Sequence, residues 1–263
     1  MKYIKGFDTL RAVSILMVVT AHLLPSGYEF YKTRLWIVVS GTTGVQIFFT
    51  LSGFLITTLL LKEKSKRGRI NFKNFFARRF IRLLPPLILF YILVGVFMIE
   101  GSISSTWIGF LFSMFYAYNF VHHDYYTVEL GHTWSLGVEE QFYLTWPFVL
   151  SSLNKVSKLT VLTVLFLGFC VLSYFIFPEL EISNNYHTDR WFIPAAAPII
   201  VGSYFAVLNH FYSMKWKEKI TDNLRVILLA IALFLYPLYS IDLTRNLFLN
   251  LPKAAIHLLC VVF

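Results

Sequence analysis

The sequence has little charge and little cysteine. Only 14% of its 263 residues are charged, whereas 57% are hydrophobic and 18% are aromatic. Because soluble domains carry about 25% charged residues, this shortage excludes a soluble domain of ordinary composition and predicts a protein embedded in lipid. The two cysteines, Cys170 and Cys260, lie in apolar stretches without a second ligand at metal spacing, so the sequence indicates neither a disulfide framework nor a zinc site.

Patterns that define several other protein classes are also missing. No cleavage site of small residues follows the apolar run from Val13 to Leu24, so we interpret this run as an uncleaved helix rather than a signal peptide. There is no Gly-x-Ser-x-Gly motif of a serine hydrolase, and we expect no metal and no bound cofactor. The formal net charge of +9 does not predict nucleic-acid binding, because the basic residues lie in short bridges between apolar runs.

Long apolar runs dominate what remains. A spanning helix needs about 20 mostly apolar residues, and we expect an all-α, polytopic transmembrane bundle of about eight helices, a single membrane domain over residues 1–263. The last expected run stops after ten residues, about half a bilayer, so we expect the chain to be truncated, with its C-terminal helices missing. The expected helices are 8–24, 36–61, 83–99, 133–153, 159–177, 191–213 and 224–241, with an eighth beginning near Ala254.

The segment from Trp107 to Phe120 decides the topology. It is short for a span and long for a turn. If it does not cross, the basic residues gather on the side of the N-terminus, which the positive-inside rule favours. We therefore expect this segment to be re-entrant or interfacial and the N-terminus to be cytoplasmic. The loops expected outside are 25–35, 121–132 and 178–190.

Three ionisable side chains fall inside the first expected helix, where lipid makes them costly. Arg11 and His22 are eleven residues apart, which at 100° per residue places both on one stripe. Asp8 precedes Arg11 by three residues and can pair with it, although such a pair could also serve only to anchor the helix at the interface. A neutral His22 could accept a proton from a hydroxyl; the alternative is a structural histidine.

A second charged site lies at residues 131–143, which read Gly-His-Thr-Trp-Ser-Leu-Gly-Val-Glu-Glu-Gln-Phe-Tyr. Adjacent helix positions point 100° apart, so one of the carboxylates of Glu139 and Glu140 can face the bundle while the other turns toward the interface or a polar partner. In the expected topology Glu139 would lie at about the depth of His22 and could orient or polarise it. The alternative is an interhelical hydrogen bond without a catalytic role.

A third charged site is the bridge from Lys62 to Arg82, in which basic residues far outnumber the single acidic residue, Glu63. This run could hold anionic lipid or act only as a topology signal. Arg79 and Arg82, however, are one helical turn apart beside a span, a placement suited to binding the phosphates of a soluble donor.

Four motifs in one order resemble the acyltransferase-3 family of multi-pass membrane enzymes, which O-acylate cell-surface polysaccharides, lipid-linked sugars and some secondary metabolites. They are Phe-Asp-Thr-Leu-Arg-Ala at 7–12 with the Arg11 to His22 spacing, and the segments 44–56, 76–85 and 133–147. The family usually has about ten helices, more than this chain can supply by its apolar runs. The C-terminal part carries no motif of this kind.

The resemblance implies a cytoplasmic acyl-coenzyme A donor, with acetyl as the default acyl group, and a location in the bacterial cytoplasmic membrane. It implies that His22 and Arg11 are needed for transfer and that Glu139 matters more than Glu140. Arg78, Arg79 and Arg82 would bind the donor. Supporting roles fall to Asp8, Trp134, Ser135, Glu140, Gln141 and Tyr143.

The resulting hypothesis is a membrane O-acyltransferase whose partners are acyl-coenzyme A, a sugar or glycolipid acceptor and membrane lipids. His22 would deprotonate an acceptor hydroxyl, Arg11 would bind the donor or fix the helix, and Glu139 would orient the histidine or the sugar. A covalent acyl-histidine relay is equally compatible with these residues. The alternative class is a glycan or lipid transporter or flippase, although the two halves lack the self-similarity of inverted repeats; a structural or sensory membrane protein would tolerate replacement of His22 and Glu139.

Overall fold

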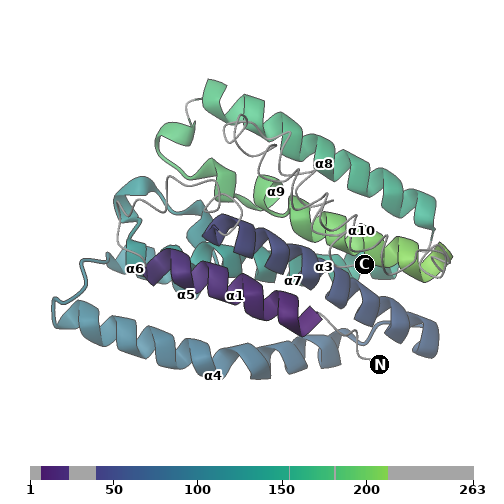
Figure 1. The fold of residues 1–263 in the computed structure, drawn as a ribbon, viewed down its shortest axis with the longest axis horizontal. Helices are drawn as coiled ribbons and strands as arrows, with labels where there is room; N and C mark the ends of the chain where they lie inside the picture. The colour runs from purple at the N-terminus through teal and green to yellow at the C-terminus, as the bar shows by residue number, and fades with distance from the viewer. Residues whose placement is uncertain (1–6, 24–39, 154, 181, 213–263) are drawn as a thin grey trace, which may run out of the picture. The chain divides into compact units, whose positions relative to one another are not determined.

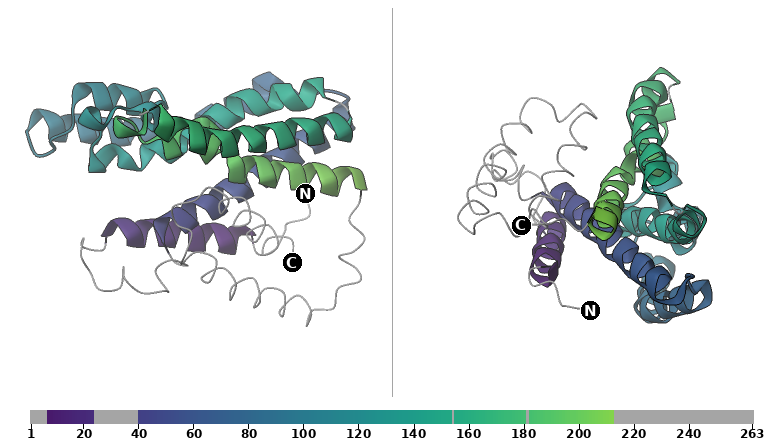
Figure 2. Two further views of the ribbon diagram at one scale, coloured as in Figure 1. Left: turned by 90° about the horizontal axis from the view of Figure 1, so that it is seen from above. Right: turned by 90° about the vertical axis from the view of Figure 1, so that its right-hand side faces the viewer.

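The computed structural model describes residues 7–23, 40–153, 155–180 and 182–212. Within these ranges the chain folds into helices joined by short connections (Figures 1 and 2). The described residues contain no β-strand, and the one extended pairing among them is an isolated antiparallel bridge between His122 and Tyr186. The all-α prediction is confirmed.

The α-helices differ greatly in length. Three of those in the described part, α3, α4 and α8, are long and apolar enough to cross a membrane, which agrees with the predicted membrane location. The α-helices are α1 (Phe7–Leu23), α3 (Gly41–Arg67), α4 (Phe72–Ile99), α5 (Trp107–Met114), α6 (Val128–Gly131), α7 (Thr133–Ser152), α8 (Val156–Glu179), α9 (Phe192–Ala195) and α10 (Ala197–Tyr212). Single 3₁₀ turns are η2 (Tyr118–Phe120), η3 (His123–Tyr125), η4 (Ile182–Asn184) and η5 (Thr188–Arg190).

Most of the expected helices are present, with shifted ends. The run expected at 191–213 is divided into α9 and α10, and Pro198 lies in the first turn of α10, where the missing amide hydrogen costs least. The expected helices 224–241 and from Ala254 onward, and the loop 25–35, lie outside the described residues.

Helix α4 begins earlier than the expected span at 83–99. Asn71 caps its start by accepting a hydrogen bond from the amide of Asn74 at 3.0 Å, and the helix continues through Pro85 and Pro86. Its 28 residues extend about 42 Å, more than the roughly 30 Å of a hydrocarbon core. The arginines expected in a surface bridge therefore lie on the helix itself.

The segment from Trp107 to Phe120 contains only a short helix. Helix α5 has eight residues, or about 12 Å, and Thr106 caps it by accepting from the amide of Gly109 at 3.1 Å. After α5 the backbone reverses at Tyr116, whose φ is 56°. A helix of this length is too short to cross a bilayer. This agrees with the prediction that the segment is re-entrant or interfacial.

The chain divides into two compact units, of which the first includes α1, most of α3 and α10. Small residues bring these helices into close contact. A Cβ atom at Gly44 would lie 2.6 Å from the Ser14 carbonyl of α1, and one at Gly53 or Gly202 would overlap the backbone of the facing helix. Backbone contact at small residues is the usual way in which helices associate in lipid.

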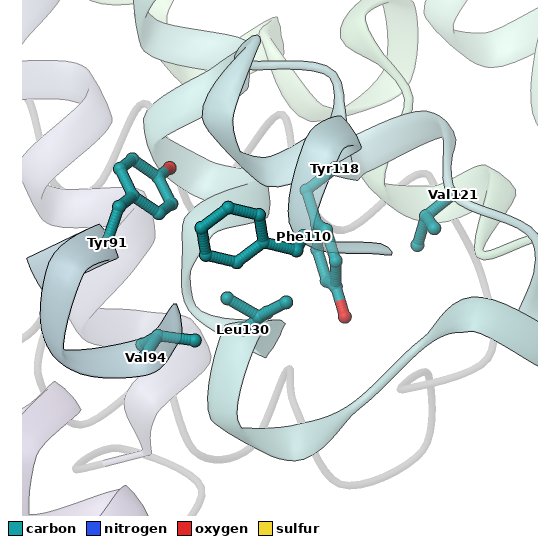
Figure 3. Packing of buried hydrophobic residues seen from close by; sticks show 6 residues of the cluster. All are labelled: Tyr91, Val94, Phe110, Tyr118, Val121 and Leu130. Carbon is teal, nitrogen blue, oxygen red and sulfur yellow. The ribbon is translucent and has the colours of Figure 1, made fainter. Parts of the chain in front are cut away.

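The second unit contains Leu60–Asn154 and Leu172–Ala195. Its core joins α4 to α5 and to the chain that follows α5 (Figure 3). The Tyr91 hydroxyl donates to the Ser113 carbonyl at 2.7 Å, which ties α4 to the end of α5. The core residues are Tyr91, Val94, Phe110, Tyr118, Val121 and Leu130.

Candidate functional site

An ion pair joins α4 to α7 inside the second unit. Arg79 Nε donates to Glu140 Oε1 at 3.0 Å, and Arg79 Nη2 lies 3.0 Å from the same oxygen. The two side chains are only 20% and 14% exposed. The pair is therefore charge-assisted and largely shielded from solvent, a setting in which loss of either partner leaves a costly unpaired charge.

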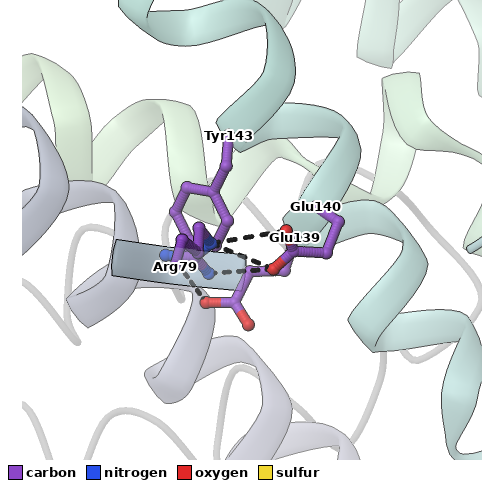
Figure 4. Close-up of polar contacts among 4 residues, drawn as sticks. All are labelled: Arg79, Glu139, Glu140 and Tyr143. Atoms are coloured by element: carbon purple, nitrogen blue, oxygen red, sulfur yellow. Dashed lines mark hydrogen bonds and ion pairs between the residues drawn. The ribbon is translucent and has the colours of Figure 1, made fainter. Parts of the chain in front are cut away.

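Tyr143 connects this ion pair to the neighbouring glutamate, Glu139 (Figure 4). Its hydroxyl donates a hydrogen bond to Glu139 Oε1, and the guanidinium carbon of Arg79 lies 3.0 Å from the centroid of its ring. Glu139 is buried, with 6% of its surface exposed. Arg79 thus contacts Glu140 directly and reaches Glu139 through Tyr143, and the two adjacent carboxylates face different partners, as predicted.

The three arginines predicted to bind the donor do not behave alike. Arg79 is engaged with Glu140 and Tyr143, whereas Arg78 and Arg82 are exposed. Because four residues of helix turn through about 400°, Arg78 and Arg82 share one side of α4. These two side chains, rather than Arg79 and Arg82, form the accessible pair of cations.

Gln141 fixes the chain reversal after α5. Its amide nitrogen donates to the Tyr116 carbonyl and to Asn119 Oδ1, both at 2.9 Å, and Asn119 donates back to Gln141 Oε1 at 3.3 Å. A Cβ atom at Gly137 would lie 2.7 Å from the Tyr116 carbonyl, so the close approach of this turn to α7 requires glycine. The sequence-based prediction included Gln141 but missed Tyr116, Asn119 and Gly137. The available signal was Asn119, a side-chain amide in the otherwise apolar segment 107–120.

A cavity of about 890 Å³ lies between α4, α5 and α7. Its wall is mostly apolar and includes Leu83, Leu84, Leu87, Ile88, Phe110 and Met114. Arg79, Glu140, Tyr91 and Tyr116 supply its polar groups. Burial, and then the negative charge of Glu140, raises the pKa of Tyr116, so this phenol keeps its proton and remains a hydrogen-bond donor.

Trp134 and Ser135 have local partners. The Ser135 hydroxyl donates to the His132 carbonyl at 3.0 Å in the first turn of α7. The guanidinium of Arg190 lies 5.7 Å from the Trp134 ring and 5.0 Å from that of Tyr126. Ser135 thus contributes to the first turn of α7, and Trp134 contacts the loop that contains Arg190.

The loops expected outside at 121–132 and 178–190 contact each other. The His123 amide donates to the Asn185 carbonyl at 2.8 Å, and the rings of His123 and His187 have centroids 4.3 Å apart. Burial, followed by the positive charges of Arg190 and His123, lowers the pKa of His187. Sequence reasoning did not single out these histidines.

The candidate residues of α1 belong to the first unit. His22 Nδ1 lies 2.7 Å from the Val18 carbonyl. Because a carbonyl only accepts, Nδ1 carries a proton, and in the tautomer with a single ring proton the lone pair is on Nε2. Arg11 is half-buried, and its Nε has no hydrogen-bond partner within the described residues. Asp8 is exposed in the first turn. The Asp8–Arg11 pair and the approach of Glu139 to His22 stay predictions.

These features define a helical membrane protein that holds ionised side chains between its helices, an arrangement typical of a reaction or translocation site in a bilayer. The family model described as "Acyltransferase domain" matches residues 4–263. The chain therefore belongs to the acyltransferase-3 family, and the predicted resemblance is confirmed.

Named relatives support the same family. A protein of Staphylococcus aureus (strain COL) called "Putative O-acetyltransferase" is 31% identical over 73% of this chain and 32% of its own length. The peptidoglycan O-acetyltransferase OatA of Listeria monocytogenes is 34% identical over 65% of this chain and 28% of its own. A Bacillus subtilis protein called "Putative peptidoglycan O-acetyltransferase YrhL" is 37% identical over 57% and 24%. The chain thus spans a third or less of the length of these relatives, and no solved structure matches it.

Proposed function

We propose that this chain carries out membrane O-acyl transfer, moving an acyl group, by default acetyl, from acyl-coenzyme A to a hydroxyl of a cell-surface sugar or glycolipid. Family membership over residues 4–263 supports acyl transfer, and the similarity to the peptidoglycan O-acetyltransferase of Listeria monocytogenes supports a cell-wall glycan as acceptor. The observation that carries the proposal is the contact of two distant family motifs, 76–85 and 133–147, at Arg79 and Glu140.

His22 is the proposed general base. Its Nδ1 is held by Val18, which leaves the Nε2 lone pair to take the proton of an acceptor hydroxyl. The hydroxyl oxygen attacks the thioester carbonyl, the carbon–sulfur bond breaks, and the coenzyme A thiolate leaves and regains a proton from the histidine. A positioned base contributes about 10²- to 10⁴-fold in rate.

Arg78 and Arg82 are the proposed donor-binding residues, since they are exposed on one side of α4 and guanidinium groups suit phosphates. Arg79 instead holds Glu140 and Tyr143, and through Tyr143 it orients Glu139. Arg11, whose Nε is buried and unpaired among the described residues, would meet the donor or fix α1.

The proposed topology follows from α5. Because an eight-residue helix does not cross the bilayer, the later basic residues Lys155 and Lys158 fall on the same side as the N-terminus and the basic bridge before α4. The positive-inside rule assigns that side to the cytoplasm. The enzyme would then lie in the bacterial cytoplasmic membrane and take its donor from inside.

Mass spectrometry of surface glycans tests this function. Cells carrying the intact gene, a deletion, His22→Ala or Leu23→Ala would be compared, with membrane levels of the protein measured in each strain. Leu23 is the neighbouring exposed residue and serves as the matched control. Loss of an acyl mass in only the deletion and His22→Ala strains supports the proposal. Unchanged glycan acylation in all four strains rejects a glycan acceptor.

A further inference from the structure

We infer that the cavity between α4, α5 and α7 binds the hydrocarbon chain of an acyl thioester, with the Tyr116 hydroxyl donating a hydrogen bond to its carbonyl oxygen. The inference rests on the proposed function for naming an acyl group as the ligand. It adds a location for that group and implies that the site admits acyl chains longer than acetyl.

The size and lining of the cavity support a long apolar ligand. Its volume of about 890 Å³ falls in the range of about 300–1,000 Å³ found for pockets that hold whole small-molecule ligands. Lining residues run along α4 from Phe76 to Ile92, a helix length of about 24 Å. An acetyl group would occupy only a small part of this space.

The cavity also holds one neutral hydroxyl donor that no other group of the described residues binds. Arg79 directs its Nε and Nη2 at Glu140, and the Tyr91 hydroxyl bonds to Ser113. Within the described residues the Tyr116 hydroxyl has no hydrogen-bond partner, although its residue lines the cavity beside Glu140. A neutral donor next to an internally neutralised ion pair suits a carbonyl oxygen better than a charged group.

The backbone at Tyr116 is held in place for this role. Its φ of 56° makes it the sole non-glycine residue with positive φ in the described part of the chain. Gln141 binds its carbonyl at 2.9 Å, and Gly137 leaves room for that carbonyl against α7. Unfavourable backbone conformations that neighbouring contacts enforce are concentrated at ligand sites.

Photolabelling of the purified full chain tests the inference. The probe is the N-acetylcysteamine thioester of an octanoic acid with a terminal diazirine, which lacks the phosphates of coenzyme A. We expect labels to concentrate on residues 83–92 and 110–116. The exposed apolar face of α8, at Val164 and Leu165, reports ordinary contact with a hydrophobic probe.

Two pairs of variants sharpen the test. Leu87→Trp fills the cavity and should reduce labelling of α4 about tenfold, whereas Leu89→Trp, on the exposed side of the same helix, should leave it unchanged. Tyr116→Phe should weaken probe binding by about 2- to 10-fold, the range of one hydrogen bond, while the control Tyr125→Phe should not.

The outcomes separate this inference from the proposed function, because the probe needs no acceptor and no coenzyme A site. Concentrated labelling without any glycan acylation supports the cavity and rejects the proposed reaction. Labels spread equally over α4 and α8, or equal labelling of the two tryptophan variants, overturn the inference even where acyl transfer is intact.

Discussion

Arg79 and Glu140 are 61 residues apart in the sequence, yet their side chains form a shielded ion pair with a 3.0 Å contact. The pair joins the arginine-rich start of α4 to the glutamates of α7. Through it Arg79 is placed over the Tyr143 ring, whose hydroxyl binds Glu139. Arg79, Glu139, Glu140 and Tyr143, which come from two motifs, thus form one connected cluster, and we expect a change in one side chain to affect the other three.

Replacing Arg79 should destabilise the fold more than replacing its neighbours. Arg79→Gln leaves the Glu140 carboxylate shielded from solvent without its cation. We expect the free energy of unfolding to fall by about 3 kcal/mol, the lower end of the range for buried ion pairs, because both side chains are partly exposed. The midpoint of thermal unfolding in detergent measures this. Arg82→Gln, at an exposed arginine, is the control, and an equal effect of the two variants would contradict the structural role of the pair.

The double variant Arg79→Gln with Glu140→Gln should recover part of the lost stability, because no unpaired charge remains. Additive losses in the double variant would show that the two side chains act independently.

Tyr143→Phe should reduce acyl transfer without lowering membrane abundance. The variant keeps the ring under Arg79 but removes the hydroxyl that binds Glu139, and loss of a hydrogen bond to a charged group corresponds to about tenfold or more. Tyr143→Leu also removes the ring and should lower abundance as well. Wild-type turnover by Tyr143→Phe would exclude a functional role for this hydrogen bond.

Gly137→Ala should destabilise the protein by about 1–3 kcal/mol, because the new Cβ would lie 2.7 Å from the Tyr116 carbonyl and the turn would have to move. Gly168 of α8 offers a matched control, since nothing lies within 4 Å of a Cβ built there. Gly168→Ala should be neutral or stabilising by up to about 1 kcal/mol. Similar unfolding midpoints for the two alanine variants would argue against a tight turn at Tyr116.

Acid should loosen the contact between the loops 121–132 and 178–190. The pKa of His187 is lowered by burial and then by Arg190 and His123, with partial opposition from Asp189. The unfolded chain therefore binds this proton more readily than the folded chain, and the free energy of unfolding falls as the pH drops through about 6.5 and below. Thermal unfolding at pH 7.5 and 5.5 should show a smaller acid effect in His187→Gln than in the wild type; an equal effect would contradict this assignment.

Much of the fold followed from the sequence because its signals are local. Apolar length predicted α1, α7 and α8 to within about three residues at each end, whereas α3 begins five residues later and ends six residues later than the expected 36–61. The short apolar segment at 107–120 was expected not to cross. The start of α4 was missed because charge was taken to mark the end of a span, whereas Asn71 caps a helix that includes the arginines.

The site was predictable by residue type but not by pairing. Adjacency of Glu139 and Glu140 predicted that they face different surroundings, yet the choice of Arg79 as partner to Glu140 and of Tyr143 as partner to Glu139 depends on how α4 and α7 pack. Tyr116 carries no sequence signal, since its role depends on a backbone reversal fixed by Gly137 and Gln141. Such tertiary contacts have no counterpart in hydrophobic periodicity.

The most direct test of the central claim is acyl transfer by the purified full chain in proteoliposomes. Isotopically labelled acetyl-coenzyme A would be supplied on one side and a peptidoglycan fragment on the other, for the wild type, His22→Ala and the control Leu23→Ala. We expect label on the glycan hydroxyl with the wild type and the control, and a rate about 10²- to 10⁴-fold lower with His22→Ala. Equal label from the wild type and His22→Ala would contradict it.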